Sequence, residues 1–331
     1  MIDRLLVLLA ALALSPGAAL AQDKSAARDE AAETLSAIVR VQAKILPNAR
    51  SSATLGPQRQ GSGVLVRDGY VVTIGYLVIE SEAIEVTGAD GRSVPASLAA
   101  YDHVSGFGLL RLLAPLAGKP LPLGDSSKLA EREPALVASF GGNDQVSLVN
   151  VVSRRPFSGS WEYQLDSAIY TYPPVMNWSG ASLISSKGEL LGLGSLIVAD
   201  STGGGTQAPG NLFVPADLLK PILEDLIARG KRGGPVRPWL GLNAEESRGR
   251  LFVVRVSPDG PADRSGLKSG DILVGVGNDE VSSLADFYRN VWARGGAGVE
   301  VPLRVLQGVQ VKEVKVRSID RMDYFRTGPR Y

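Results

Sequence analysis

Apolar and polar residues alternate along much of the chain in short runs, a pattern typical of β-strands that bury one face. The first such run is Val39–Ile45. A period of two places every second side chain on the same side of a strand, so these runs predict half-buried strands rather than helices. Asp-Gly pairs at residues 68–69 and 90–91 separate neighbouring runs and favour tight hairpin turns. The pattern therefore predicts a mainly β protein.

The runs fall into two consecutive sets with no long helical pattern between them. The first set lies within residues 61–124 and the second within residues 133–214. Two such sets predict either two small β-barrels or one large sandwich, and the runs alone do not choose between them. Residues 217–229 then carry apolar side chains three and four positions apart, which predicts a helix after the second set.

A second domain follows a segment rich in glycine and proline. Residues 230–236 have the composition of a linker. Residues 237–320 then show two strands, a short helix, a third strand, a longer helix over Ser283–Arg294 and two final strands. Serine at the start of the longer helix and Gly295 after it are common helix boundaries. This order is typical of a PDZ domain, and residues 321–331 are expected to form a C-terminal tail.

Residues 1–21 have the pattern of a secretory signal peptide. A basic residue near the start is followed by the apolar stretch Leu5–Leu14 and by a small-residue cleavage site ending at Ala21. The apolar stretch is too short to span a bilayer. We therefore expect cleavage after Ala21 and a mature protein that is periplasmic or secreted, without a membrane anchor. Residues 22–60 are expected to contain an N-terminal helix, the first strand and a loop.

The composition of the chain excludes several classes of function. The formal net charge is +1, and the chain contains no cysteine and one histidine. A balanced charge gives no reason to expect binding to nucleic acid or to acidic membranes. The absence of cysteine excludes disulfides and thiolate metal sites. We therefore expect neither a bound metal nor a cofactor.

Three stretches of the chain resemble the segments that carry the catalytic residues of the HtrA family, periplasmic trypsin-like proteases with a serine-histidine-aspartate triad. Residues 73–78 read Thr-Ile-Gly-Tyr-Leu-Val, residues 105–110 read Ser-Gly-Phe-Gly-Leu-Leu, and residues 177–182 read Asn-Trp-Ser-Gly-Ala-Ser. The resemblance covers roughly residues 39–320. It implies a trypsin-like double β-barrel over residues 61–229, followed by the PDZ-like domain.

The same resemblance implies a degenerate triad. Ser179 occupies the serine position, but Tyr76 occupies the histidine position and Gly106 the aspartate position. A serine hydroxyl is a poor nucleophile unless a base removes its proton, and a tyrosine hydroxyl with a pKa of about 10 is no base at neutral pH. By resemblance, the backbone N–H groups of Asn177 and Ser179 form the oxyanion hole. The single histidine, His103, is expected in an exposed turn away from this site.

The PDZ-like domain carries a second candidate site. Leu240, Gly241 and Leu242 resemble the hydrophobic-Gly-hydrophobic turn that offers backbone N–H groups to the C-terminal carboxylate of a peptide. The peptide then adds as a strand to the edge of the sheet. Phe287 and Val291 share one face of the longer helix, where they either line the peptide groove or belong to the core.

These observations predict a secreted HtrA-like pseudoprotease that binds peptides or protein C-termini, as a scaffold or regulator in the cell envelope. Two alternatives stay open. One is an active serine endopeptidase or esterase with a non-standard site on Ser179, and the other is a modulatory subunit of an active HtrA protease. HtrA proteins commonly form trimers, so the resemblance also implies a homo-oligomer, although no feature of the sequence fixes its stoichiometry.

Overall fold

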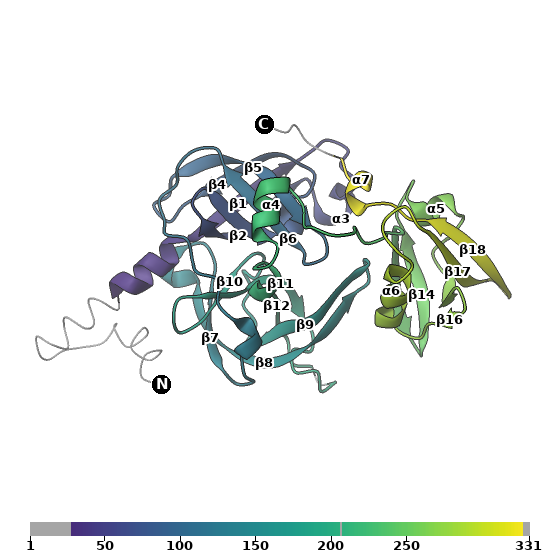
Figure 1. The fold of residues 1–331 in the computed structure, drawn as a ribbon. Helices are drawn as coiled ribbons and strands as arrows, with labels where there is room; N and C mark the ends of the chain where they lie inside the picture. The colour runs from purple at the N-terminus through teal and green to yellow at the C-terminus, as the bar shows by residue number, and fades with distance from the viewer. Residues whose placement is uncertain (1–27, 206, 327–331) are drawn as a thin grey trace, which may run out of the picture. The chain divides into compact units, whose positions relative to one another are not determined.

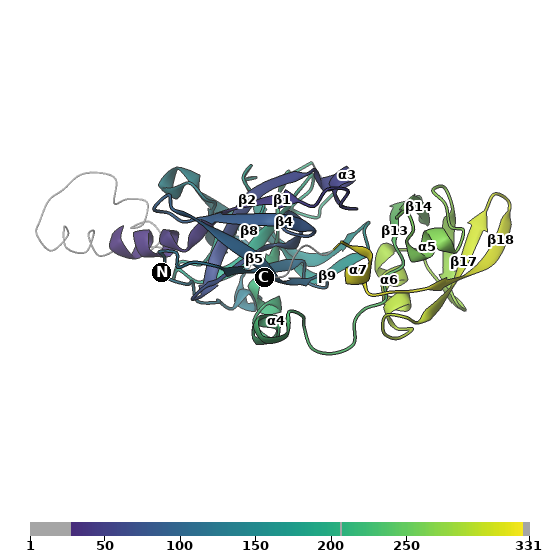
Figure 2. The same cartoon turned by 90° about the horizontal axis from the view of Figure 1, so that it is seen from above.

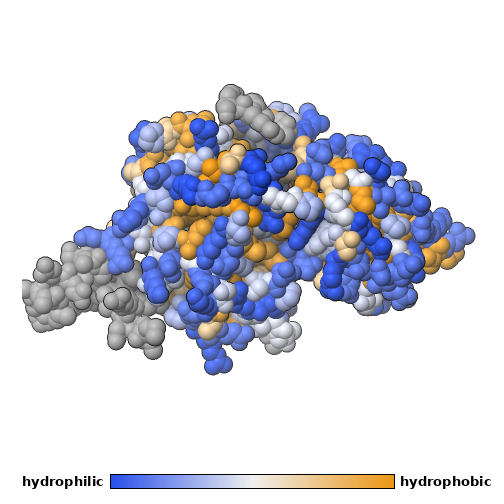
Figure 3. Space-filling model, viewed as in Figure 1, coloured by the Kyte–Doolittle hydropathy of each residue, from blue (hydrophilic) through white to orange (hydrophobic). Residues whose placement is uncertain are grey.

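The computed structural model describes residues 28–205 and 207–326. The predicted signal peptide, with its cleavage site after Ala21, lies outside these residues. No helix in the described part of the chain is long and apolar enough to cross a membrane. Hydrophilic residues cover much of the face drawn in Figure 3, with hydrophobic areas between them.

The chain divides into two compact units, and this division does not follow the order of the sequence. The first unit contains the described residues up to Arg155 and also Ser167–Arg232. The second unit contains Gly233–Arg326 together with Pro156–Asp166, a segment that interrupts the first unit in the sequence. Strands form most of the regular structure in both units, which confirms the predicted mainly β class (Figure 1).

The first unit contains two closed barrels, and the first barrel has the strand order β1-β2-β3-β6-β5-β4. β1 closes this barrel because it pairs with both β2 and β4. Val39 and Val41 on β1 are fully buried whereas Arg40 between them is not, as the alternating pattern predicts. The strands are β1 Ile38–Ile45, β2 Gln58–Arg67, β3 Tyr70–Ile74, β4 Ser81–Thr87, β5 Ser93–Asp102 and β6 Phe107–Leu112.

The predicted domain start at residue 61 is therefore too late. β1 is a barrel strand, and β2 already begins at Gln58. The loop expected before residue 61 also contains a short helix, α3, which spans Ser52–Leu55. Residues 28–36 are helical. The alternation of β1 could be seen in the sequence, but its pairing with β4 depends on residues far along the chain, so the local pattern did not reveal it.

The second barrel has the strand order β10-β11-β12-β9-β8-β7. Its core includes Ile169, Leu183 and Phe213, which are all fully buried. The prediction of two barrels is thus confirmed, and the alternative of one sandwich is wrong. The strands are β7 Pro134–Ala138, β8 Val146–Gly159, β9 Tyr163–Tyr172, β10 Ser182–Ile184, β11 Leu190–Val198 and β12 Gly210–Pro215.

The helix predicted over residues 217–229 is shorter than expected. A 3₁₀ turn, η4, spans Ala216–Leu218, and the helix α4 spans only Leu223–Arg229. Pro221 lies between them and has no N–H to donate, so the chain turns here instead of continuing as one helix. The other 3₁₀ turns of this unit are η1 Gly75–Leu77, η2 Ser126–Lys128 and η3 Gly142–Gln145.

The second unit is built on one antiparallel sheet with the order β13-β14-β15-β17-β18, and β16 pairs with β15. β13 therefore forms one edge of the sheet. Residues 231–238, which precede it, form neither helix nor strand. The elements are β13 Leu242–Ser247, β14 Arg250–Val256, α5 Pro261–Arg264, β15 Ile272–Val276, β16 Asp279–Glu280, α6 Leu284–Trp292, β17 Glu300–Gln307, β18 Gln310–Arg317 and α7 Arg321–Tyr324.

Helix α6 packs its apolar face into the core of this sheet (Figure 2). The Ser283 side chain accepts a hydrogen bond from the N–H of Asp286 and caps the helix as predicted. Phe287 and Val291 are 0% and 1% exposed and belong to the core cluster. Of the two alternatives for these residues, the structure therefore favours core packing over lining of a groove.

The prediction of a tail from residue 321 is wrong for its first residues. Helix α7, Arg321–Tyr324, packs on the second unit, with the ring of Tyr324 centred 4.7 Å from that of Trp239. The Tyr324 hydroxyl donates a hydrogen bond of 3.0 Å to the carbonyl oxygen of Pro258. A single short turn with one aromatic contact gives little periodicity in the sequence, so the pattern did not predict it.

Ending the chain after Asp320 tests the contribution of α7 to stability. This truncation removes the Trp239–Tyr324 ring pair and the hydrogen bonds of Tyr324 and Arg321, so we expect it to destabilise the second unit by about 1–3 kcal/mol. Urea unfolding followed by tryptophan fluorescence measures the change. A chain that ends after Arg326 keeps α7 and is the matched control. Equal unfolding midpoints for the two truncations would show that α7 adds no stability.

Candidate functional site

The structure brings the predicted serine and histidine positions together. Tyr76 lies in η1, directly after β3 of the first barrel, and Ser179 lies in the loop before β10 of the second barrel. The hydroxyl oxygen of Tyr76 is 2.9 Å from Oγ of Ser179 and 3.0 Å from the carbonyl oxygen of Ser195. The phenol therefore occupies the space beside Ser179 where a base would have to lie.

In the described structure, the hydroxyl of Tyr76 is shared between Ser179 and the carbonyl oxygen of Ser195. A carbonyl oxygen only accepts, so Tyr76 donates its one proton either to Ser195 or to Ser179. Burial raises the pKa of Tyr76 to about 12, and its hydrogen bonds with Ser179 and Trp178 lower it only in part. Tyr76 is therefore a neutral hydrogen-bond partner at pH 7, as expected from the sequence.

Arg59 and Glu80 hold the backbone that carries Tyr76. Nη1 of Arg59 donates to the carbonyl oxygens of Tyr76 and Ile79 at 2.7 and 3.1 Å. Its Nη2 donates to Oγ of Ser51 at 2.7 Å, and Ser51 in turn donates to the buried carboxylate of Glu80. Burial lowers the pKa of Arg59 to about 10, although the charge of Glu80 opposes this shift. Arg59 thus stays charged at neutral pH and holds the backbone of η1 through the carbonyl oxygen of Tyr76.

Gly106, at the aspartate position, has a backbone conformation that suits glycine. Its φ is 85°, in the left-handed region where other side chains are strained. Its N–H donates to the carbonyl oxygen of Asp102 at 2.7 Å, and its carbonyl oxygen accepts from the N–H of Gly75 at 2.7 Å. The glycine therefore both lacks a carboxylate and shapes the turn that leads toward η1.

Asp102 and His103 lie close to Gly106 in the sequence, and the structure places Asp102 in an ion pair with Arg232. Asp102 pairs with Arg232 through two hydrogen bonds of 2.7 and 2.8 Å and also accepts from the N–H of Ser105. His103 lies in a turn as expected, but it is half-buried rather than exposed. It is not among the described residues that line the cavity at Ser179. The carboxylate of Asp102 is therefore the ion-pair partner of Arg232.

Backbone hydrogen bonds hold the loop around Ser179. The carbonyl oxygen of Ser179 accepts from the N–H of Ser62 at 2.8 Å, and that of Asn177 accepts from Oγ of Ser139 at 2.7 Å. Asn177 and Trp178 line a cavity of about 260 Å³ beside Ser179. The predicted oxyanion residues, Asn177 and Ser179, thus lie in one anchored loop at this cavity.

The predicted carboxylate-binding turn of the second unit already holds a carboxylate of the same chain. The backbone N–H groups of Leu240, Gly241 and Leu242 donate to the side chain of Glu162 at 2.9, 2.7 and 3.1 Å. Gly241 has a φ of 82°, which aims consecutive N–H groups at one acceptor. Glu162 lies in the turn between β8 and β9, within the segment Pro156–Asp166 that belongs to this unit.

Sequence reasoning missed Glu162. The pattern gave only one set of strands within residues 133–214, whereas in the structure β8 continues to Gly159, β9 begins at Tyr163, and Glu162 lies in the turn between them. The signal that was present is the alternation of aromatic and polar residues from Phe157 to Tyr163, but nothing local indicates where a single acidic side chain points.

Burial determines the protonation of this glutamate. Removal from water raises the pKa of Glu162 to about 7, while the three N–H donors and the charge of Arg321 lower it. Desolvation is the largest of these effects, because the charged form loses its hydration when it is enclosed.

Comparisons with known proteins agree with the two units. The family model of the trypsin-like peptidase domain matches residues 61–193, and the model of the PDZ domain matches residues 238–317. A probable periplasmic serine protease of Haemophilus influenzae is 30% identical over 273 residues, which are 78% of this chain and 57% of that protein. The periplasmic pH-dependent serine endoprotease DegQ of Escherichia coli is 28% identical, over 77% of this chain and 58% of DegQ. The chain spans about half the length of the curated relatives it matches.

Solved structures share the fold. The HtrA-type protease AlgW, solved with a tripeptide, is 21% identical with a TM-score of 0.53, over 91% of this chain and 98% of that one. The serine endoprotease from Yersinia pestis is 22% identical with a TM-score of 0.52, over 88% of this chain and 97% of that one. The predicted trypsin-like double barrel followed by a PDZ domain is thereby confirmed.

Replacing Glu162 with glutamine tests its raised pKa. The native carboxyl keeps its proton up to about pH 7, whereas in the unfolded chain it is lost above its ordinary pKa of 4.5. The native state thus binds more protons between these values, so the wild type loses stability as the pH rises through this window. Glu162→Gln cannot titrate and lacks this loss.

We expect the wild type to lose on the order of 3 kcal/mol relative to Glu162→Gln between about pH 4.5 and about pH 7.5. Urea unfolding of both proteins at each pH measures the difference. A difference that is independent of pH would contradict the raised pKa.

Proposed function

We propose that this chain, with its trypsin-like peptidase and PDZ domains, is an HtrA-like pseudoprotease that binds peptides without cleaving them. The observation that carries the proposal is the hydrogen bond between Tyr76 and Ser179 at the place of the catalytic base. The fold comes from the comparisons, which also support the likeness to HtrA proteases, whereas the loss of catalysis is inferred from this chain's own side chains.

The chemistry of Ser179 supports this proposal. Attack by a serine requires a neighbouring group that takes its proton as the new bond forms. With a pKa of about 12, roughly one Tyr76 hydroxyl in 10⁵ is ionised at pH 7. Gly106 has no carboxylate that could orient or charge a base. An anchored loop with Asn177 and Ser179 is then an oxyanion site without an attacking group.

The second unit supports binding as the remaining activity. The turn Leu240–Leu242 holds a carboxylate by three N–H groups, which is the chemistry needed to bind the C-terminus of a peptide. We infer a periplasmic location from the relatives, which are named as periplasmic proteases, and from the predicted signal peptide. A scaffold or regulator that binds exposed C-termini in the cell envelope fits both observations.

The purified protein should not hydrolyse casein or peptide esters. The expected rate equals that of the Ser179→Ala variant, because Ser179 has no base to activate it. A fluorogenic casein assay over hours compares the two proteins, and a fluorophosphonate probe reports any activated serine directly. Activity or labelling that is present in the wild type and lost in Ser179→Ala would support the alternative of an active endopeptidase or esterase.

Restoring the two missing residues together, as Tyr76→His with Gly106→Asp, should not create an efficient protease. Triad residues act as a unit and depend on their positions. A side chain at the φ of 85° of Gly106 costs about 1–3 kcal/mol and shifts the turn. The same casein assay, with Tyr76→Phe as the inactive control, measures the outcome. Rapid casein cleavage by the double variant would show that the site has stayed preorganised for catalysis.

A further inference from the structure

We propose that Glu162 is a built-in ligand of the PDZ domain, which holds the place of a peptide's C-terminal carboxylate, so that a free C-terminal peptide binds only by displacing it. This proposal rests on the proposed peptide binding by the same turn. It concerns the second unit alone, to which both the turn and the segment that carries Glu162 belong.

A second carboxylate cannot share the turn with Glu162. All three N–H groups of Leu240, Gly241 and Leu242 point at its two carboxylate oxygens. Each N–H is a single donor, and Glu162 is 5% exposed. A peptide carboxylate therefore needs these donors freed first.

The turn before Glu162 also imitates the backbone of a bound peptide. The N–H of Ala244 on β13 donates to the carbonyl oxygen of Ser160 at 3.0 Å. N–H groups two residues apart on a strand point to the same side, so those of Leu242 and Ala244 both face the open edge of β13. The turn thus makes the two kinds of contact that a strand-adding peptide makes, one to the carboxylate turn and one to the sheet edge.

Further hydrogen bonds hold this turn in its bound shape. The hydroxyl of Tyr288 on α6 donates to the carbonyl oxygen of Gly159 at 2.6 Å and accepts from the N–H of Glu162 at 3.1 Å. Nη1 of Arg321 on α7 donates to the carbonyl oxygen of Trp161 at 3.3 Å. The φ of Glu162 is 57°, a left-handed value that a non-glycine residue keeps only when its surroundings fix it. The turn is therefore preorganised for this position.

An attached ligand competes strongly with a free one. A short tether gives an effective concentration in the millimolar range. If Glu162 occupies the turn in at least about 90% of molecules, the apparent affinity for a free peptide falls at least about tenfold, because only the open fraction binds. Removing the carboxylate should restore that affinity.

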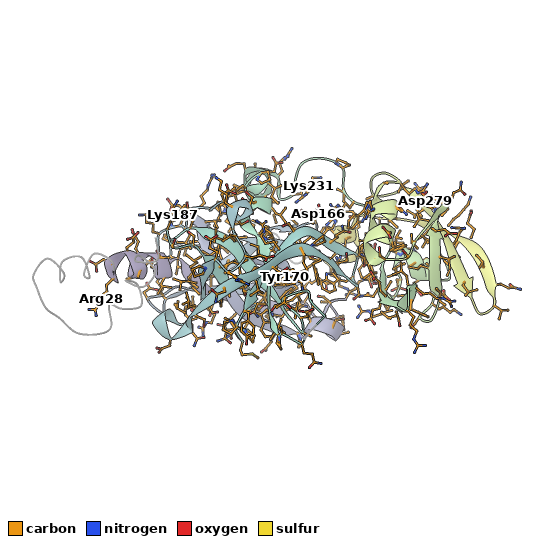
Figure 4. The ribbon with its side chains drawn as sticks, turned by 90° about the horizontal axis from the view of Figure 1, so that it is seen from below. Arg28, Asp166, Tyr170, Lys187, Lys231 and Asp279 are labelled. Carbon is orange, nitrogen blue, oxygen red and sulfur yellow. The ribbon has the colours of Figure 1, made fainter. Side chains whose placement is uncertain are left out.

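The test compares Glu162→Ala with Asp166→Asn in the full-length chain. Asp166 lies on β9 in the same segment, is exposed and is also acidic, so its replacement is the control (Figure 4). Hydrogen exchange of the amides of residues 240–242 reports occupancy of the turn without any ligand. An array of fluorescent decapeptides with varied last residues, each as free acid and as amide, reports binding.

We expect fast exchange of these amides in Glu162→Ala and slow exchange in the wild type and Asp166→Asn. We also expect Glu162→Ala to bind free-acid peptides at least about tenfold more tightly than the wild type. Unchanged exchange of the β17 amides shows that the variant is folded, and Glu162→Gln, which keeps one acceptor oxygen, should give intermediate values in both measurements.

The outcomes separate this proposal from the proposed function. Slow exchange in Glu162→Ala, or equal peptide affinities in the variant and the wild type, overturns the built-in ligand. Fast exchange in a folded Glu162→Ala that binds no peptide supports occupancy by Glu162 but refutes peptide binding as the function. Equal binding of acids and amides likewise refutes the role of the turn as a carboxylate site.

Discussion

Polar groups that a fold removes from water must find partners inside it, and both candidate sites of this chain are arranged around that constraint. The hydroxyl of Tyr76 bonds with Ser179, and the carboxylate of Glu162 accepts three backbone N–H bonds. In each site, a group that would serve a substrate or ligand is already bonded to another part of the same chain. The same hydrogen bonds that satisfy these buried groups thus occupy the positions where a substrate or ligand would bond.

Tyr76 at the predicted histidine position links the two barrels. It follows β3 of the first barrel, whereas Ser179 and Ser195 belong to the second, and its hydroxyl bonds with both of these residues. A smaller residue would leave the Ser179 hydroxyl without this partner. Gly106 at the aspartate position adopts a left-handed turn. The nearby carboxylate of Asp102 pairs with Arg232. The cleft can therefore persist without a triad.

Local alternation predicted the mainly β class and the strand β1, whereas the two barrels were implied by the resemblance to HtrA proteases. The same resemblance placed Tyr76 and Ser179 at the histidine and serine positions, and the structure brings these two residues together. Strand pairing was less accessible, since β1 closes a barrel through residues of β4 that no local pattern connects with it. Glu162 was not predictable at all, because its role depends on a turn that joins a unit formed mainly by residues 233–326.

Burial of the Glu162 carboxylate opposes the bonds that hold it. Desolvation of the ionised carboxylate opposes the three N–H bonds, which is why its pKa is raised to about 7. A peptide carboxylate in the same turn would use the same three N–H donors, so these donors alone do not favour the peptide. The edge of β13 can distinguish the two ligands. In the described structure, the turn that carries Glu162 bonds with this edge only as far as Ala244, whereas the strand continues to Ser247. A longer peptide strand can pair with that remaining edge, and these added backbone bonds give it the advantage over a built-in ligand.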